Sequence, residues 1–173
     1  MSIIEQARTV ARKALAQGAL QSFRTQSRVL EQQNIPFIVR IADSLNHKPK
    51  APSRTPVIRN PFLPYEQSLF VCELGSKHVC LLNKFNVIDD HLLIITKEYQ
   101  PQSCWLELDD FSALTPLLQE FDGLGFYNGG TTAGASQHHK HLQYIPRQAL
   151  AEGKDLPWSH FILSPLPRFI VAW

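Results

Sequence analysis

The sequence predicts an α+β fold, in which antiparallel strands and helices come from separate stretches of the chain. Short β-branched runs bounded by turn residues indicate the strands, and a long amino-terminal stretch has helical periodicity. One further helix pattern interrupts the strands. With 173 residues, 44% of them hydrophobic, the chain can bury a core, so one domain spanning residues 1–173 is expected.

The amino-terminal stretch is expected to be helical. Apolar residues recur at intervals of three and four from Ile3 to Leu15, which is typical of an amphipathic helix. We expect helix over residues 2–33, which Gly18 can break in two, within a helical segment that covers residues 1–35.

Runs of β-branched and aliphatic residues predict the strands. They cover residues 37–41, 69–74, 78–82, 91–96, 125–127 and 140–145. Gly75-Ser76 joins two of them as a hairpin. Asp89-Asp90 could bind a metal, but acidic pairs between strands more often form turns.

A second helix and a carboxyl-terminal tail complete the expected elements. The helix covers residues 111–121, with Asp109 or Asp110 as its cap and Pro116 limiting or kinking it. The tail, 147–173, ends in an apolar run without turn chemistry, and such an open strand edge would invite pairing with another chain. We therefore expect the tail to pack against something outside this sequence or to belong to an incomplete carboxyl-terminal region.

Residues 46–64 form a loop rich in proline and basic residues, since proline lacks the amide hydrogen that regular structure needs. Its cations are Lys48, Lys50, Arg54 and Arg59, with no acidic residue between them. The loop is either a solvated linker or a basic flap that closes over a polyphosphate. Composition alone leaves both interpretations open.

Composition and charge exclude several classes of protein. A net charge of +2 gives no basic field for nucleic acid. No apolar run approaches the ~20 residues that cross a bilayer, and no signal peptide is recognisable, so no membrane partner is expected. Three cysteines without a Cys-x-x-Cys pair indicate reduced thiols, and a cytoplasmic location is expected.

The densest group of reactive side chains is His138 to Gln143, which follows a run of small residues from 128 to 137. On a strand, His139, His141 and Gln143 would share one face, and the residues between them would share the other. Two imidazoles beside a loop with accessible amides suit a nucleophile that handles phosphate. The alternatives are structural histidines or a chelated metal. No acid or cysteine lies nearby and the His-Glu-x-x-His spacing is missing, so no protein-bound metal is expected.

The motif His139-Lys140-His141-Leu142-Gln143 resembles the His-x-His-x-Gln motif of the transferase branch of the histidine-triad superfamily. The closer resemblance is to the diadenosine tetraphosphate (Ap4A) phosphorylases, also called ATP adenylyltransferases. The segments that carry it are residues 60–65, 78–86, 91–96 and 134–137, within a match over about 36–146. The resemblance implies a histidine-triad-like antiparallel sheet with flanking helices, and a catalytic sheet and loop over 65–146.

The resemblance also implies a reaction, in which Ap4A and phosphate give ATP and ADP through an adenylylated histidine. His141 matches the nucleophile and His139 its partner in the motif. A neutral imidazole attacks phosphorus near pH 7 if an acceptor, such as a backbone carbonyl, holds its other nitrogen. Gln143 replaces the third histidine of the hydrolase branch. A carboxamide is no acid or base, so transfer to phosphate is favoured over hydrolysis, unless Gln143 merely fills the strand.

Further residues match the nucleotide-binding positions of the family. They are Ser136 and Gln137 near the α-phosphate, Asn128 and Gly129 on the nucleotide side, Asn83, Lys84 and, more weakly, Lys48. Lys84 could instead be a solvated strand-end lysine, and His138 is additional to the pattern. Mg²⁺ is expected to arrive with the nucleotide substrate.

Other functions stay open. A sugar-1-phosphate nucleotidylyltransferase shares the motif, although Cys72, His78 and Cys80 do not form the zinc-ligand pattern of that relative. The family is longer, and only 30 residues follow Gln143 here. The chain is therefore an amino-terminal portion, a shortened relative, or a catalytically weak nucleotide-binding module. Relatives often pair two half-barrels, so a homodimer is expected by analogy.

Overall fold

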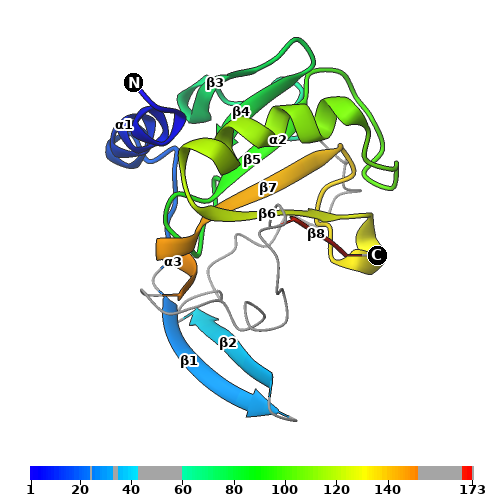
Figure 1. Cartoon of the computed structure of the whole chain (residues 1–173). Coiled ribbons are helices and arrows are strands. Elements are labelled where there is room, and N and C mark those ends of the chain that lie inside the picture. The colour runs from blue at the N-terminus through cyan, green and yellow to red at the C-terminus, as the bar shows by residue number, and fades with distance from the viewer. Residues whose placement is uncertain (24, 33–34, 43–59, 152–168, 173) are drawn as a thin grey trace, which may run out of the picture.

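The computed structural model describes residues 1–23, 25–32, 35–42, 60–151 and 169–172, and it consists of a six-stranded sheet, its helices and a separate hairpin (Figure 1). The helices are α1 (Ile3–Ala16), α2 (Leu108–Glu120) and α3 (Arg147–Ala151), with short 3₁₀ turns at Gln67–Leu69 and Thr131–Ala133. The strands are β1 (Thr25–Gln32), β2 (Ile35–Ala42), β3 (Phe70–Leu74), β4 (His78–Leu82), β5 (Leu92–Thr96), β6 (Gly123–Asn128), β7 (His141–Pro146) and β8 (Phe169–Ala172).

The main sheet has the order β3-β4-β5-β7-β6-β8, and all its pairs are antiparallel except β6 with β8. One face packs under α1 and α2 around a core that includes Leu114, Leu142 and Tyr144. On the other face a smaller cluster joins Phe62 to Leu93 and to neighbouring strand residues. The prediction of an α+β fold is confirmed. No helix in the described part of the chain is long and apolar enough to cross a membrane.

Helix α1 begins where its sequence provides a cap. Ser2 and Glu5 form a capping box, because each side chain accepts a hydrogen bond from the backbone N–H of the other residue. The helix ends at Ala16, and Gly18 has a φ of 72°, which the absence of a Cβ makes accessible. The predicted helix is therefore right only as far as residue 16.

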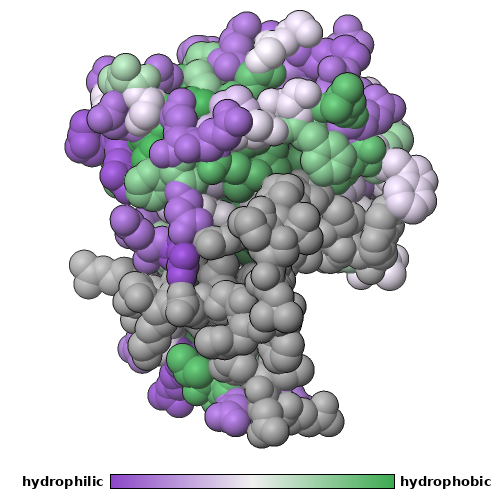
Figure 2. Space-filling model, in the orientation of Figure 1, coloured by the Kyte–Doolittle hydropathy of each residue, from purple (hydrophilic) through white to green (hydrophobic). Residues whose placement is uncertain are grey.

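The prediction of helix beyond Gly18 is wrong, because residues 25–32 form strand β1. It pairs antiparallel with β2, with Val29 opposite Ile38. The cross-strand partner overrides a local sequence that mixes helix and strand formers. The hairpin projects away from the main sheet (Figure 1), and Figure 2 shows hydrophobic side chains among hydrophilic ones at its end and around α2.

Helix α2 also differs from the prediction at its start. Its cap is Glu107, whereas Asp110 stands one turn inside and accepts a hydrogen bond from the Glu107 N–H over 2.8 Å. Pro116 does not limit the helix, which continues to Glu120. Proline here leaves the carbonyl of residue 112 without its helical partner, and that residue is exposed to water.

The tail begins with α3 and returns to the sheet. Strand β8 pairs parallel to β6, with Gly125 opposite Phe169. One edge of residues 169–172 is thus paired within the chain, whereas β8 is itself the last strand of the sheet, so the expectation of a further partner or of an incomplete carboxyl-terminal region stays a prediction. Of the basic loop 46–64, residues 43–59 lie outside the described part, so the choice between linker and flap stays open.

Candidate active site

Strand β7 separates its side chains as its alternation predicts. His141 and Gln143 line a cavity on the face away from α1 and α2, whereas Leu142 and Tyr144 belong to the core beneath these helices. The strand lies between β5 and β6, with Gln143 opposite Leu93. An inner strand is held from both sides, which fixes the direction of its side chains.

The ring of His141 has one nitrogen bonded and one available. Its Nδ1–H donates to the backbone carbonyl of His139 over 2.8 Å, and no described residue bonds its Nε2. Burial, together with the nearby ring of His139, lowers the pKa of His141 against the opposing effect of that hydrogen bond. The imidazole is therefore neutral at pH 7, with its lone pair on Nε2. The sequence predicted such a carbonyl but could not say which residue supplies it.

The backbone of His141 is clamped by Gln102. The Oε1 of Gln102 accepts the N–H of His141 over 2.7 Å, while its Nε2 donates to the carbonyls of His141 and Asn128 over 3.1 and 2.8 Å. Gln102 is 3% exposed, so these bonds form away from water. One carboxamide thus ties the nucleophile candidate to the end of β6. Sequence reasoning missed Gln102, which lies in a loop without any local motif.

His139 is buried behind the cavity rather than inside it. Its Nε2–H donates to the carbonyl of Thr96 over 2.9 Å and lies 2.8 Å from its hydroxyl, while its Nδ1 accepts from Asn60 Nδ2 over 2.9 Å. Both nitrogens are therefore occupied. The ring of Phe62 lies between, with centroids 5.7 Å from His139 and 5.3 Å from His141. His139 offers its backbone carbonyl to the ring of His141, and a catalytic role for its own ring stays a prediction.

The cavity in front of His141 has a volume of about 700 Å³. Its walls hold six more of the residues that the sequence predicted for nucleotide binding or catalysis: Asn83, Lys84, Asn128, Ser136, Gln137 and Gln143. Gly129 follows Asn128 but does not itself line the described wall, and Lys48 lies outside the described residues. The structure therefore brings seven of the ten predicted residues, His141 included, to one cavity.

The loop between β6 and β7 forms one wall of this cavity. Gly130 and Gly134 have φ values of 95° and 93°, a region that favours glycine. Gly130 donates to the carbonyl of Asn128 over 2.8 Å and accepts from the Ala135 N–H over 3.0 Å. These contacts fold the loop back, and they bring Ser136 and Asn128 to the same cavity.

The opposite wall carries the charged and aromatic residues. Lys84 forms an ion pair with Glu66, and its Nζ lies 5.9 Å from the ring centroid of Phe85. The ring of Phe23 tilts against Phe85 at 6.4 Å. The predicted cation is therefore present at the cavity, but a carboxylate already neutralises it.

A buried ionic cluster lies at the start of β7, on the side of α2. Lys140 Nζ lies 2.6 Å from Asp110 Oδ2, and His78 Nε2 lies 2.9 Å from the other oxygen, with all three side chains at most 3% exposed. Burial opposes ionisation of Asp110, but hydrogen bonds from His78 and Lys140 keep its pKa below the usual value. The cluster joins β4 and the residue just before β7 to the first turn of α2.

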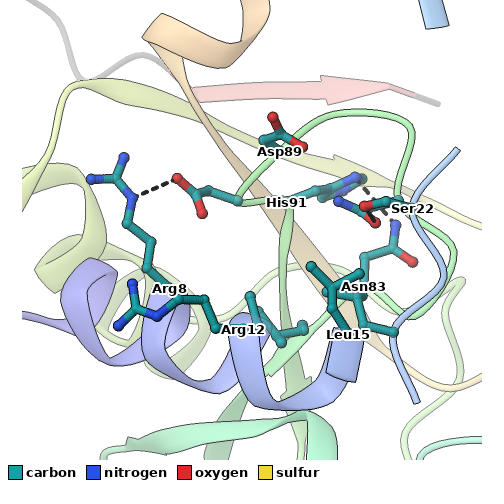
Figure 3. Close-up of a pocket in the computed structure, with 12 residues that line it drawn as sticks. Arg8, Arg12, Leu15, Ser22, Asn83, Asp89 and His91 are labelled. Carbon is teal, nitrogen blue, oxygen red and sulfur yellow. Dashed lines mark hydrogen bonds and ion pairs between the residues drawn. The ribbon is translucent and has the colours of Figure 1, made fainter. Parts of the chain in front are cut away.

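A second cavity of about 290 Å³ lies between α1 and the loop that precedes β5 (Figure 3). Arg8 reaches across it to Asp90, with Nε 2.8 Å from Oδ2, and His91 and Asn83 form its inner wall. Asp90 has a φ of 55°, as in a turn. No group of three or more histidine, cysteine or acidic residues that could hold a metal occurs among the described residues.

Comparisons with known proteins agree on one family. A family model described as the Ap4A phosphorylase N-terminal domain matches residues 1–164. Protein APA1 of Saccharomyces cerevisiae is 34% identical over 124 residues, which are 65% of this chain and 38% of that protein. Diadenosine 5′,5‴-P1,P4-tetraphosphate phosphorylase 2 of the same yeast is 32% identical over 170 residues, or 76% of this chain and 52% of that protein.

A solved structure has the same fold. The crystal structure of yeast Ap4A phosphorylase Apa2 in complex with Ap4A gives a TM-score of 0.68 at 28% identity, covering 87% of this chain and 56% of that chain. The complex of Apa2 with AMP gives a TM-score of 0.69 over 82% of this chain and 49% of that chain. This chain spans about half the length of the relatives that it matches.

An α+β sheet in which His-x-His-x-Gln leads into an inner strand beside a glycine loop defines the transferase type of histidine-triad protein. Within that class, the chain belongs to the family of the Ap4A phosphorylase N-terminal domain. The family resemblance read from the sequence is thereby confirmed.

Proposed function

We propose that this chain carries the nucleotidyl-transfer site of an enzyme that phosphorolyses Ap4A to ATP and ADP. The observation that carries the proposal is the geometry of His141. Its Nδ1–H donates to a backbone carbonyl, and its side chain, with Nε2 available, lines a cavity of about 700 Å³. The relatives named as Ap4A phosphorylases support the choice of substrate.

The reaction proceeds in two displacements. The Nε2 lone pair of His141 attacks the α-phosphorus of Ap4A, the bond to the bridging oxygen breaks, and ATP leaves. The adenylyl-imidazole carries a positive charge, which the hydrogen bond from Nδ1–H to the carbonyl of His139 stabilises. Inorganic phosphate then attacks the same phosphorus, the bond to Nε2 breaks, and ADP leaves with a neutral histidine.

The remaining residues of the cavity bind the nucleotide and its charge. Ser136, Gln137 and Gln143 offer donors to the phosphoryl oxygens as charge develops there, and Asn128 and Asn83 bind the nucleotide side. Lys84, and Lys48 of the basic loop, offset part of the negative charge. Mg²⁺ is carried by the phosphates of the substrate, and no step depends on a metal held by the protein.

Covalent labelling tests this proposal. Incubation with Ap4A or ATP labelled in the adenine should leave AMP on His141, in an acid-labile and base-stable phosphoramidate. His141→Ala should abolish the labelling, and His138→Ala, at an exposed neighbouring ring, should label like the wild type. Equal labelling of the wild type and His141→Ala would refute the assignment.

A substitution of Gln143 tests whether phosphate or water accepts the adenylyl group. A histidine there can donate a proton and activate water, so Gln143→His should increase AMP release relative to ADP formation, by about tenfold for one added acid–base group of modest efficiency. The measurement is the AMP to ADP ratio in the presence of phosphate. An unchanged ratio would mean that another feature selects phosphate.

A second candidate is a nucleotide-binding module without turnover of its own. It predicts that Ap4A binds to the cavity without labelling of His141. Pairing of two chains, or of two half-barrels in one chain, also stays a prediction.

A further inference from the structure

The backbone N–H of Phe85 determines how the side-chain amide of Asn83 is oriented at the wall of the cavity. The N–H of Phe85 points to Oδ1 of Asn83 at 3.4 Å, so the Nδ2 of that carboxamide faces the other way, 3.2 Å from Nδ1 of His91. An amide nitrogen only donates, and a ring nitrogen accepts only when it carries no proton. The Nδ1 of His91 is therefore the unprotonated nitrogen.

The proton of a neutral His91 must then be on Nε2. Burial lowers the pKa of His91 to about 4, although the bond to Gln143 opposes this, and the ring of His141 adds to the lowering. At neutral pH the ring is thus uncharged with a proton on Nε2, which donates to Oε1 of Gln143 over 2.9 Å.

The carboxamide of Gln143 has two ends of opposite polarity. With Oε1 engaged by His91, its Nε2 carries two hydrogens that have no bond to His91, on a side chain that lines the cavity with His141. A carboxamide that could rotate freely would present its oxygen to a phosphate half of the time and repel it. A fixed donor instead stabilises charge without reorganisation.

We propose that His91 is a positioning residue that locks Gln143 with its NH₂ group toward the phosphoryl oxygens of the bound nucleotide. This inference rests on the proposed function for the nucleotide, but the orientation of the two side chains does not depend on it. His91 lies in the wall between the two cavities, and it lines the second one (Figure 3). It acts through Gln143 and touches no substrate.

A matched pair of substitutions separates positioning from packing. His91→Gln keeps a side chain that can donate to Oε1, whereas His91→Phe keeps a ring but removes the donor. We expect adenylylation of His141 within about threefold of the wild type for His91→Gln. For His91→Phe we expect a rate lower by about tenfold or more, as is common when a group that orients a functional side chain is lost.

A double-mutant cycle decides whether His91 acts through Gln143. In a Gln143→Ala background, His91→Phe should cost little further, because its target is already absent. A full tenfold loss in that background, or none in the wild-type background, would overturn the proposal. Failure of the wild type to label would instead count against the proposed function.

The tautomer can be measured directly, without any variant. Long-range ¹⁵N–¹H spectra of the ¹⁵N-labelled protein at pH 7 should show His91 as a neutral ring protonated on Nε2. A ring protonated on Nδ1 would reverse the donor and acceptor roles of the bonds from Asn83 to His91 and from His91 to Gln143. That result would overturn the proposal, whether or not His141 becomes adenylylated. Addition of AMP should shift the side-chain NH₂ resonances of Gln143, and unshifted resonances with AMP bound would also overturn it.

Discussion

The two sides of β7 and of the residues just before it bury polar groups in opposite ways. Toward the cavity, His139 and His141 are neutral, and each has a backbone carbonyl as acceptor. Toward α2, the amine of Lys140 is bonded to the carboxylate of Asp110. Both faces are shielded from water, and the difference lies in the partners that each face supplies. A nucleophile requires a lone pair without a proton, which carbonyl partners provide and a carboxylate would endanger by favouring the imidazolium.

We expect the largest loss of stability from a substitution in the ionic cluster. Lys140→Met fills similar space but leaves the buried carboxylate of Asp110 with only His78 and the N–H of Glu107 as partners. Removal of one partner of a buried pair costs about 3–5 kcal/mol of unfolding free energy. Urea denaturation at pH 7.5 measures it. The matched control is Lys77→Met, which removes an exposed partner of Asp109 and should leave the denaturation midpoint unchanged. Similar midpoints for the two variants would contradict the importance of the buried pair.

Acid should disturb the cavity face first. The folded pKa of His91 is about 4, and that of an unfolded histidine is ~6.5. The unfolded chain then binds more protons between these values, so stability falls as the pH drops from 6.5 to 4, by on the order of 3 kcal/mol for this residue. His139 and His141, with lowered pKa values, act in the same direction. Asp110, whose folded pKa is depressed, loses its contribution only as the pH falls below the unfolded carboxyl value and through its own lower pKa.

Denaturant unfolding at several pH values between 7.5 and 4 tests whether the histidines lose their contribution to stability before Asp110 does. His91→Gln should have a shallower loss of stability over that window, since glutamine does not titrate there. An identical pH slope for the wild type and this variant would show that His91 is already charged, or already neutral, in both states.

The smallest effect concerns the charge at the rim of the cavity. Glu66→Gln should release Lys84 for the polyphosphate and raise affinity for Ap4A severalfold at low salt, because an exposed ion pair contributes about 0.2–1 kcal/mol. At 1 M salt the gain should vanish, since screening shortens to ~3 Å. The matched control is Glu73→Gln, which frees Lys97 away from the cavity and should leave affinity unchanged. Equal gains in both variants would indicate a net-charge effect.

The sequence predicted well what depends on alternation along one strand. The period of two in β7 placed His141 and Gln143 on one face and Leu142 and Tyr144 on the other. The order of residues could not reveal Gln102, because its bonds to β7 and β6 join positions 39 and 26 residues away. Only the folded sheet brings such partners together.

The two wrong predictions, helix over residues 25–32 and a cap at Asp109 or Asp110, also arise from long-range partners. Residues 25–32 carry glutamine, leucine and glutamate, which favour helix, yet pairing with β2 makes them a strand. The expected cap at Asp109 or Asp110 was displaced to Glu107, because Asp110 is needed by Lys140 and His78 beneath the helix. Long-range partners outweighed local preference in both cases.

The insertion of β7 between β5 and β6 affects the way in which the protein is made. Both neighbours leave the ribosome before β7 does, and each keeps an unpaired edge until the last strand of the motif arrives. The strand that carries His141 is thus also the one that joins β5 to β6. A nascent chain that stops before residue 141 leaves β5 and β6 each with an open edge and lacks the nucleophile, so the proposed chemistry is excluded while those edges can still aggregate.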